Sequence, residues 1–247
     1  MITGAASGLA AGVAPLLARN GFAHVAITFR TTLPDETLAA IRAADATASA
    51  HQVDFLDDEL LIEKRLAAIV KDEGPFDTLV HAVGPLIVKR FVRLTPDECR
   101  EMIDGNFKSA VLAARAVLPH MRERRFGRLV FFGANGSSET RPARGFSVYV
   151  AAKSAVVAFA RTLALEEAQF GITVNVIEPG DIREKSVTRD EAQHRAARNP
   201  RGRLGSFEDV ADVVRFLVEP ERDFVTGAVI GVTGGLWEAD ERNAPSS

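Results

Sequence analysis

The sequence predicts a single α/β domain built on a doubly wound parallel sheet whose first strand is truncated. Strand-like and helical patterns alternate along nearly the whole chain of 247 residues, which is typical of a parallel sheet with helices on both faces. The strand-like runs are almost entirely apolar, as strands buried on both faces should be. A glycine-rich turn, TGAASG, begins at residue 3, so only the first three residues remain for the strand that should carry it.

In the first half of the chain, amphipathic runs bounded by stop signals predict helices, and short runs of β-branched and aromatic residues predict strands. The expected order is a helix at 9–19, a strand at 24–29, a helix at 34–44, a strand at 49–53, a helix at 57–72 and a strand at 76–83. Asn20-Gly21 ends the first helix, and Gly84-Pro85 closes the last of these strands.

The same patterns continue through the second half. The expected order is a helix at 96–124, a strand at 128–133, a helix at 149–170, a strand at 172–180, a helix at 207–218 and a strand at 228–235. A highly charged segment between Ile182 and Arg203 interrupts the alternation and is expected to lie outside the core. The polar residues 237–247 are expected to form a frayed tail.

Composition excludes several classes of function. The net charge of −3 and the absence of a basic patch with interleaved aromatic residues argue against nucleic-acid binding. A single cysteine, Cys99, rules out an internal disulfide, and no Cys/His cluster has the spacing of a metal site. No apolar run reaches the roughly 20 residues of a membrane span, and no signal-peptide pattern is visible. We therefore expect a cytoplasmic protein without a metal.

The turn TGAASGLA has the composition of a phosphate-binding loop. Gly4 and Gly8 let the backbone turn tightly and approach a pyrophosphate, and the following helix offers free N–H groups at its positive end. Glycine-rich turns also join elements without binding anything, so this motif alone does not decide between the two roles.

Two residues at the ends of later strands fit the adenosine half of a dinucleotide. Arg30 directly follows the strand at 24–29, where a cation accommodates a 2′-phosphate and an acidic residue would instead bind a free 2′-hydroxyl. Asp54 follows the next strand and is either an adenine contact or a helix cap. A solvated surface arginine is the equally simple alternative for Arg30.

Tyr149 and Lys153 are four residues apart in YVAAK and so share one face of a predicted helix. A cation beside a phenol favours the phenolate, which lowers the tyrosine pKa from about 10 and suits it to acid–base chemistry near neutral pH. The alternative is a pair on a helix face with no role. It is weakened because Tyr149 is the one tyrosine of the chain.

The ordered set of motifs resembles the short-chain dehydrogenase/reductase family, and most closely its 3-oxoacyl-ACP reductase type. The resemblance runs from Thr3 to Gly235 and implies one Rossmann-type dinucleotide-binding and catalytic domain over 1–236, with a substrate lid at 183–205. It rests on the following residues: TGAASGLA, Asp54, Asn106, Tyr149, Lys153, PGDI at 179–182 and TGAVIGVTGG at 226–235.

The resemblance implies a mechanism and a cofactor site. Tyr149 would protonate a carbonyl as a nicotinamide supplies hydride, Lys153 would lower the tyrosine pKa and hold the ribose, and Asn106 would anchor a proton-relay water. NADP(H) is favoured over NAD(H) because of Arg30. The residues expected to bind the cofactor are Gly4, Ser7, Gly8, Leu9, Arg30, Asp54, Phe55, Ala82, Gly84, Tyr149, Lys153, Pro179, Gly180 and Ile182.

The sequence also departs from the family pattern. Ala134 stands where the family has a serine hydrogen-bonded to the substrate oxygen, so Ser137, Ser138 or no residue replaces that donor; losing it typically costs ~3 kcal/mol, about a hundredfold in rate. His81 replaces an asparagine and is interpreted as a hydrogen-bonded core residue. Two further changes are Ala10 for the third glycine of the loop and Glu184 near the place of a threonine.

The segment 183–203 is unusually rich in charge and carries several arginines. It either favours an anionic or carrier-bound carbonyl substrate, or merely keeps a loop solvated. The helix at 149–170 is more apolar than one sheet face requires, and the related family pairs subunits through it, so a homodimer or homotetramer is expected.

The sequence leaves two pairs of alternatives open, one on the activity of the chain and one on its first strand. The chain is an NAD(P)-dependent carbonyl reductase, or a catalytically impaired member of the family that serves as a cofactor-binding or structural subunit. The short first strand leads us to expect a natural chain that begins a few residues upstream of Met1. The other interpretation is a chain that begins here, binds its cofactor weakly and is marginally stable.

Overall fold

The computed structural model describes residues 1–180, 182, 187–197 and 199–235. Its centre is a seven-stranded, wholly parallel sheet in the order β3-β2-β1-β4-β5-β6-β7. The strand order reverses between β1 and β4, which confirms the predicted doubly wound α/β fold. The strands are β1 (Ile2–Thr3), β2 (His24–Phe29), β3 (Thr47–Gln52), β4 (Thr78–His81), β5 (Gly127–Phe132), β6 (Ile172–Pro179) and β7 (Val229–Val232).

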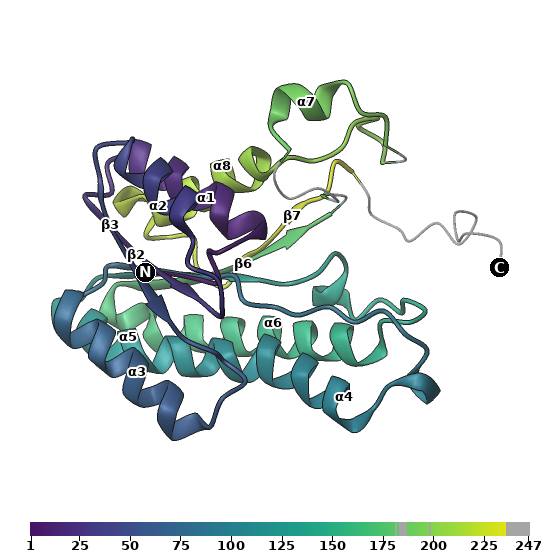
Figure 1. The fold of residues 1–247 in the computed structure, drawn as a ribbon, viewed down its shortest axis with the longest axis horizontal. Helices are drawn as coiled ribbons and strands as arrows, with labels where there is room; N and C mark the ends of the chain where they lie inside the picture. The colour runs from purple at the N-terminus through teal and green to yellow at the C-terminus, as the bar shows by residue number, and fades with distance from the viewer. Residues whose placement is uncertain (181, 183–186, 198, 236–247) are drawn as a thin grey trace.

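Helices cover both faces of the sheet, as Figure 1 shows. One layer contains α1, α2 and α8, and the other contains α3, α4, α5 and α6. The helices are α1 (Gly8–Arg19), α2 (Asp35–Arg42), α3 (Glu59–Glu73), α4 (Pro96–Ile103), α5 (Ser109–Arg124), α6 (Ser147–Glu167), α7 (Arg189–Gln193) and α8 (Phe207–Val218). Short 3₁₀ turns occupy Phe91–Arg93, Ser137–Glu139, Ala168–Phe170 and Pro220–Arg222.

Two hydrophobic cores follow from the alternation of side chains along the strands. On β5, Leu129 and Phe131 belong to the core under α3, α5 and α6, while Val130 and Phe132 belong to the core under α1, α2 and α8. Neighbouring residues of a strand face opposite sides of a sheet, so a strand buried on both faces must be apolar throughout. The nearly uninterrupted apolar run RLVFF therefore correctly predicted a buried strand.

The first strand is as short as predicted, but it still joins its neighbours. Ile2 pairs with Ile27 of β2 and with Val80 of β4. The pairing extends past both ends of the strand, because Val80 N donates to Met1 O over 3.0 Å and Ala5 N donates to Thr28 O over 3.0 Å. The backbone hydrogen bonds thus continue to the carboxyl end of the sheet, from which the glycine-rich turn projects.

The helix predicted over 96–124 is not regular. α4 and α5 are joined by a π-helical turn, Asp104–Lys108, which contains Asn106. Such a turn inserts a residue into an otherwise continuous helix and is often found at functional sites. Because helical patterns continue on both sides of the turn, the sequence predicted one helix.

α6 and the turn after it, Ser147–Phe170, have the length and hydropathy of a membrane span by composition. In the fold, Val156, Val157 and Ala160 of this helix are buried in the core against the sheet. The apolar character of α6 is thus explained in part by packing. Its far side is less covered, and Leu165 is 82% exposed.

Candidate active site

A cavity of about 500 Å³ opens at the carboxyl ends of the strands, beside the reversal of strand order. The turns that follow β1 to β6 and the first part of α6 line it, which is where open α/β sheets bind their ligands. The lining includes every residue that the sequence analysis assigned to the cofactor: Gly4, Ser7, Gly8, Leu9, Arg30, Asp54, Phe55, Ala82, Gly84, Tyr149, Lys153, Pro179, Gly180 and Ile182.

The glycine-rich turn is shaped to receive a phosphate. Gly4 and Gly8 have φ values of 73° and 71°, in the left-handed region that favours glycine. A Cβ on Gly4 would lie 3.1 to 3.3 Å from atoms of Ala82 and Val83, so the turn packs closely on the end of β4. Ser7 is the residue before α1, and its side chain accepts no hydrogen bond from the helix. The first N–H groups of α1 are therefore left for an anion.

Arg30 and Asp54 meet at the other end of the cavity. Arg30 Nε donates to Asp54 Oδ2 over 3.0 Å, and Asp54 Oδ1 accepts from Leu56 N over 3.0 Å. Glu101 of α4 lies 4.0 Å from the Arg30 guanidinium. Sequence reasoning missed Glu101, because no local pattern connects it with a strand end 71 residues earlier. The guanidinium therefore stands between two carboxylates, with its side chain 57% exposed.

Lys153 and Tyr149 lie one turn apart on α6. Lys153 is buried, and its Nζ donates to Phe132 O over 2.8 Å. Nζ lies 5.9 Å from the centroid of the Tyr149 ring. Burial raises the pKa of Tyr149 above its ordinary value. The net direction is thus opposite to the lowering that the sequence analysis expected: the four-residue spacing fixes a shared helix face, but burial dominates and the ammonium donates to the carbonyl of Phe132.

Asn106 lies directly behind Gly84. Its Nδ2 donates to Pro85 O over 2.9 Å and to Met102 O over 2.8 Å, while its buried Oδ1 has no partner among the described residues. A Cβ on Gly84 would lie 2.8 Å from Asn106 Oδ1 and 2.9 Å from Lys153 Nζ. The amide oxygen and the ammonium thus face the same small space, which is open only because residue 84 has no side chain. Buried polar side-chain atoms normally have a hydrogen-bond partner, so the unpaired Oδ1 sets Asn106 apart from its neighbours.

The turn after β5 contains Ala134, which stands at the place of the family serine, as well as Ser137 and Ser138. Ala134 lines the cavity, whereas Ser137 and Ser138 are not among its lining residues. The Ser137 hydroxyl is buried and donates to the Glu178 carboxylate over 2.8 Å. The Ser137 hydroxyl hydrogen is thus directed to Glu178 and not into the cavity. Sequence reasoning missed Glu178, although an acidic residue in the apolar run ITVNVIEP was a usable signal.

His81 makes two buried hydrogen bonds, in agreement with its interpretation as a core residue. Ser109 Oγ donates to Gly105 O over 2.7 Å, so it accepts from His81 Nε2 over 3.0 Å. His81 Nδ1 then accepts from Thr3 Oγ1 over 2.8 Å. Burial, assisted by the charge of Lys153, lowers the pKa of His81 to about 3. The neutral ring joins the end of β1 to the π-helical turn that carries Asn106.

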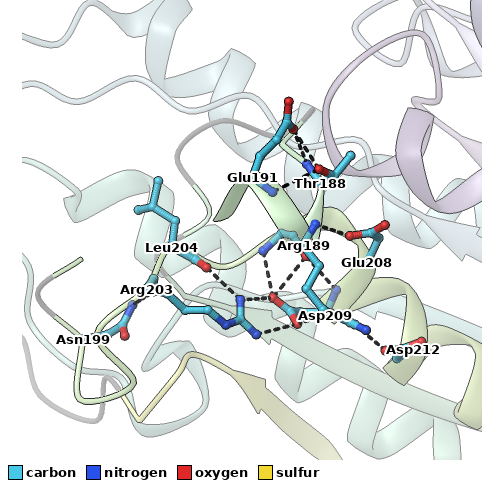
Figure 2. Close-up of polar contacts among 10 residues, drawn as sticks. Thr188, Arg189, Glu191, Asn199, Arg203, Leu204, Glu208, Asp209 and Asp212 are labelled. Carbon is cyan, nitrogen blue, oxygen red and sulfur yellow. Dashed lines mark hydrogen bonds and ion pairs between the residues drawn. The ribbon is translucent and has the colours of Figure 1, made fainter. Parts of the chain in front are cut away.

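Two of the arginines expected in a substrate lid are bound to α8, as Figure 2 shows. Arg203 donates to both oxygens of Asp209 over 2.8 and 2.9 Å, and Arg189 donates to Asp209 over 3.2 Å and to Asp212 over 2.5 Å. Burial alone would raise the pKa of Asp209. The hydrogen bonds from Arg203 and Ser206 outweigh it and bring this pKa well below its ordinary value. The charges of these two arginines are thus largely compensated within the protein.

Other parts of the predicted lid and the tail are not described. Arg183, Glu184, Lys185 and Arg198, as well as 237–247, lie outside the described residues. The described part of the lid contains α7, which the sequence analysis did not predict. Val187, Ala192 and Leu204 form a small hydrophobic cluster there.

Comparison with known proteins gives consistent matches over nearly the whole chain. A family model described as enoyl-(acyl carrier protein) reductase matches residues 4–237. The 3-oxoacyl-[acyl-carrier-protein] reductase FabG of Haemophilus influenzae is 32% identical over 240 residues, covering 96% of this chain and 97% of FabG. The 2,3-dihydroxy-2,3-dihydro-p-cumate dehydrogenase of Pseudomonas putida is 33% identical over 244 residues, covering 95% of this chain and 92% of the dehydrogenase.

Among solved structures, a variant of the actinorhodin polyketide ketoreductase with NADPH superimposes with a TM-score of 0.84. The two chains are 28% identical, and the match covers 96% of each. Matches of this extent include the strand ends that line the cavity.

The buried His81 predicts a specific dependence of stability on pH. The unfolded chain protonates this imidazole near pH 6.5 and the folded chain only near pH 3, so the unfolded state binds more protons in between. The contribution of His81 is therefore complete above pH 6.5 and falls by about 1.4 kcal/mol per pH unit below it. We expect urea unfolding of His81→Asn to show a shallower loss of stability from pH 6 to pH 4.

A matched variant, His120→Asn, changes a more exposed imidazole at the end of α5. It should retain the wild-type slope. Equal slopes in wild type and His81→Asn would contradict the burial of a neutral imidazole.

Proposed function

The chain belongs to the short-chain dehydrogenase/reductase family of NAD(P)-dependent oxidoreductases, and from this premise we propose that it reduces a ketone, such as a 3-oxoacyl group, to an alcohol with NADPH. The observation that carries the proposal is one cavity lined by Tyr149, Lys153 and a glycine-rich turn, with Asn106 directly behind Gly84 of its wall. The cofactor supplies the hydride when bound. The chain's own residues must then orient the carbonyl and deliver one proton.

In the proposed reaction Tyr149 is the proton donor. Burial raises its pKa, so the hydroxyl is protonated at neutral pH and can donate to the carbonyl oxygen as negative charge develops there. In the reductive direction proposed, the tyrosine acts as an acid. Lys153 would hold the nicotinamide ribose and stabilise the tyrosinate that remains after proton transfer.

Asn106 would complete a path by which Tyr149 recovers its proton. Its unpaired Oδ1 and Lys153 Nζ face one small space behind Gly84. A water there would accept from Lys153 and donate to Asn106, and so hold an exchangeable proton beside the ammonium. Asn106 touches this water and not the substrate, since it lies outside the cavity lining.

The preference for NADP(H) is proposed from Arg30. Its guanidinium lies at the cavity mouth beyond β2, where a 2′-phosphate would meet it. The two neighbouring carboxylates, Asp54 and Glu101, offset part of its charge, so we infer a moderate preference and not an exclusive one. The NADPH complex of the similar actinorhodin ketoreductase supports the same choice.

We propose a carbonyl substrate that is small or carrier-bound, as the name of the similar FabG proteins implies for them. The anionic-substrate hypothesis loses part of its basis, because Arg189 and Arg203 are already paired with α8. The exposed apolar side of α6, including Leu165, supports a homodimer or homotetramer. The single cysteine supports a cytoplasmic setting.

Replacement of the tyrosine hydroxyl separates catalysis from binding. We expect Tyr149→Phe to lower kcat at least a hundredfold on a panel of ketones, because the general acid is lost. NADPH affinity, measured by fluorescence, should stay within about threefold. Ser147→Ala, an exposed change two residues earlier on the same helix, should leave both values unchanged. Equal turnover in Tyr149→Phe and wild type would overturn the assignment of Tyr149, and wild type that oxidises no NADPH with any ketone would favour the catalytically impaired alternative.

The role of Arg30 is tested by titrating both cofactors. Arg30→Gln should weaken NADPH binding about tenfold, which corresponds to about 1.4 kcal/mol, and leave NADH binding nearly unchanged. Arg19→Gln, a charge-matched control at the exposed end of α1, should change neither. The same loss for NADPH and NADH would show that Arg30 does not recognise the 2′-phosphate.

Restoring a hydroxyl at residue 134 should accelerate the reaction. Ala134 and Tyr149 both line the cavity, where a second donor would stabilise the developing oxyanion. We expect Ala134→Ser to raise kcat/KM by about 10- to 100-fold in steady-state assays with NADPH. Ala134→Cys, which is similar in size but a weak donor, serves as the control. A rate unchanged by serine would show that the carbonyl binds away from residue 134.

A further inference from the structure

The turn after β5 is folded around a single carboxylate. Glu178, on β6, is 5% exposed. Its Oε1 accepts from Ser137 Oγ over 2.8 Å and from Ser138 N over 2.7 Å, and its Oε2 accepts from Gly136 N over 3.1 Å. An ionised carboxylate has acceptor sites only, so it matches three convergent donors. A neutral side chain of similar size would not match them.

The backbone of the turn also fits this carboxylate, because glycines stand at residues 133 and 136. A Cβ on Gly133 would lie 2.8 Å from Ser137 Oγ and 3.0 Å from Glu178 Cγ, so a larger residue would push the two groups apart. Gly136 has a φ of 79°, a left-handed conformation that favours glycine, and its N–H reaches the carboxylate. Ser137 Oγ also accepts from Ala134 N over 3.1 Å. Ala134 is thus fixed through Ser137 to Glu178.

The same group of contacts reaches three walls of the cavity. Ala134 belongs to the turn itself, and Pro179 and Gly180 directly follow Glu178. On α6, Ser154 Oγ donates to Ser137 O over 2.7 Å, immediately after Lys153 in the sequence. One carboxylate therefore couples the turn after β5, the end of β6 and the helix that carries the proposed acid.

We propose that Glu178 is a positioning residue for the reaction: it holds Ala134, Pro179 and Gly180 in register with Tyr149. The inference rests on the proposed function. Glu178 is absent from the cavity lining and does not exchange a proton with the substrate. Glu178 acts through geometry, because it sets the positions of Ala134, Pro179 and Gly180 relative to α6.

The test uses Glu178→Gln in the full-length protein, which keeps the size of the side chain and places an NH₂ group among N–H donors. The matched control is Glu167→Gln, since Glu167 is similarly buried but pairs with Arg122 at the far end of α6. Ser137→Ala is a milder second variant, because it removes one donor and leaves the two backbone N–H groups. Hydrogen exchange of the peptide covering 134–140, NADPH affinity and steady-state kinetics are measured for each.

We expect Glu178→Gln to accelerate exchange in 134–140 at least tenfold and to lower kcat at least tenfold. NADPH affinity should stay within about threefold, because the proposed phosphate and adenosine contacts lie beyond β1, β2 and β3, and of the proposed cofactor contacts Glu178 holds only Pro179 and Gly180. Ser137→Ala should show smaller changes in the same direction. Glu167→Gln should lose thermal stability without a change in kcat beyond twofold or in exchange at 134–140.

The outcomes separate the two levels of inference. Unchanged exchange in Glu178→Gln would refute the role of the carboxylate in holding the turn. Faster exchange with unchanged kcat would refute the positioning role. Wild type that binds no NADPH and turns over no ketone would refute the proposed function. In that case faster exchange would leave the carboxylate a purely structural group, and the positioning role would also fall.

Discussion

The rest of the site depends on how a two-residue strand is held at the centre of the sheet. β1 pairs with both neighbours, but Ile2–Thr3 alone gives few backbone bonds. The hydrogen bond from Thr3 to His81 adds a side-chain link to β4, and His81 passes it on to Ser109 and the π-helical turn. Thr3, His81 and Ser109 are all buried, so each of these hydrogen-bonding side chains relies on the next for its partner. The phosphate turn and Asn106 are thereby fixed by the same set of contacts.

Local sequence patterns predicted the parts of the site that depend on local geometry. The TGAASG turn needs glycine for its positive φ values, and YVAAK places two side chains on one face of a helix. The order of the strands then brings these motifs together, because the carboxyl ends of parallel strands meet at one edge. The fold class and the cavity lining were therefore accessible from the sequence.

Contacts between residues far apart in the chain were not accessible in this way. Glu178 meets Ser137 across 41 residues, and Arg30 approaches Glu101 across 71. The pKa of Tyr149 is raised by burial, which the spacing of Tyr149 and Lys153 on a helix does not reveal. The arginines of the lid segment suggested an anionic substrate only because their partners on α8 were unknown. Tertiary partners, more than residue types, determine what these charges do.

The missing serine and the buried carboxylate are parts of one arrangement. Ser137 has one hydroxyl hydrogen, and it is given to Glu178, so it is not available to a substrate. Without that donor, Oε1 would keep only its hydrogen bond from Ser138 N, and losing a hydrogen bond to a charged group is unfavourable by about 1.5–3 kcal/mol. Rotating Ser137 toward the cavity would thus weaken the turn that positions Ala134. The chain has a well-fixed wall beside Tyr149 and no serine hydroxyl at residue 134, so in the proposed reaction the proton from Tyr149 would provide most of the stabilisation of the oxyanion.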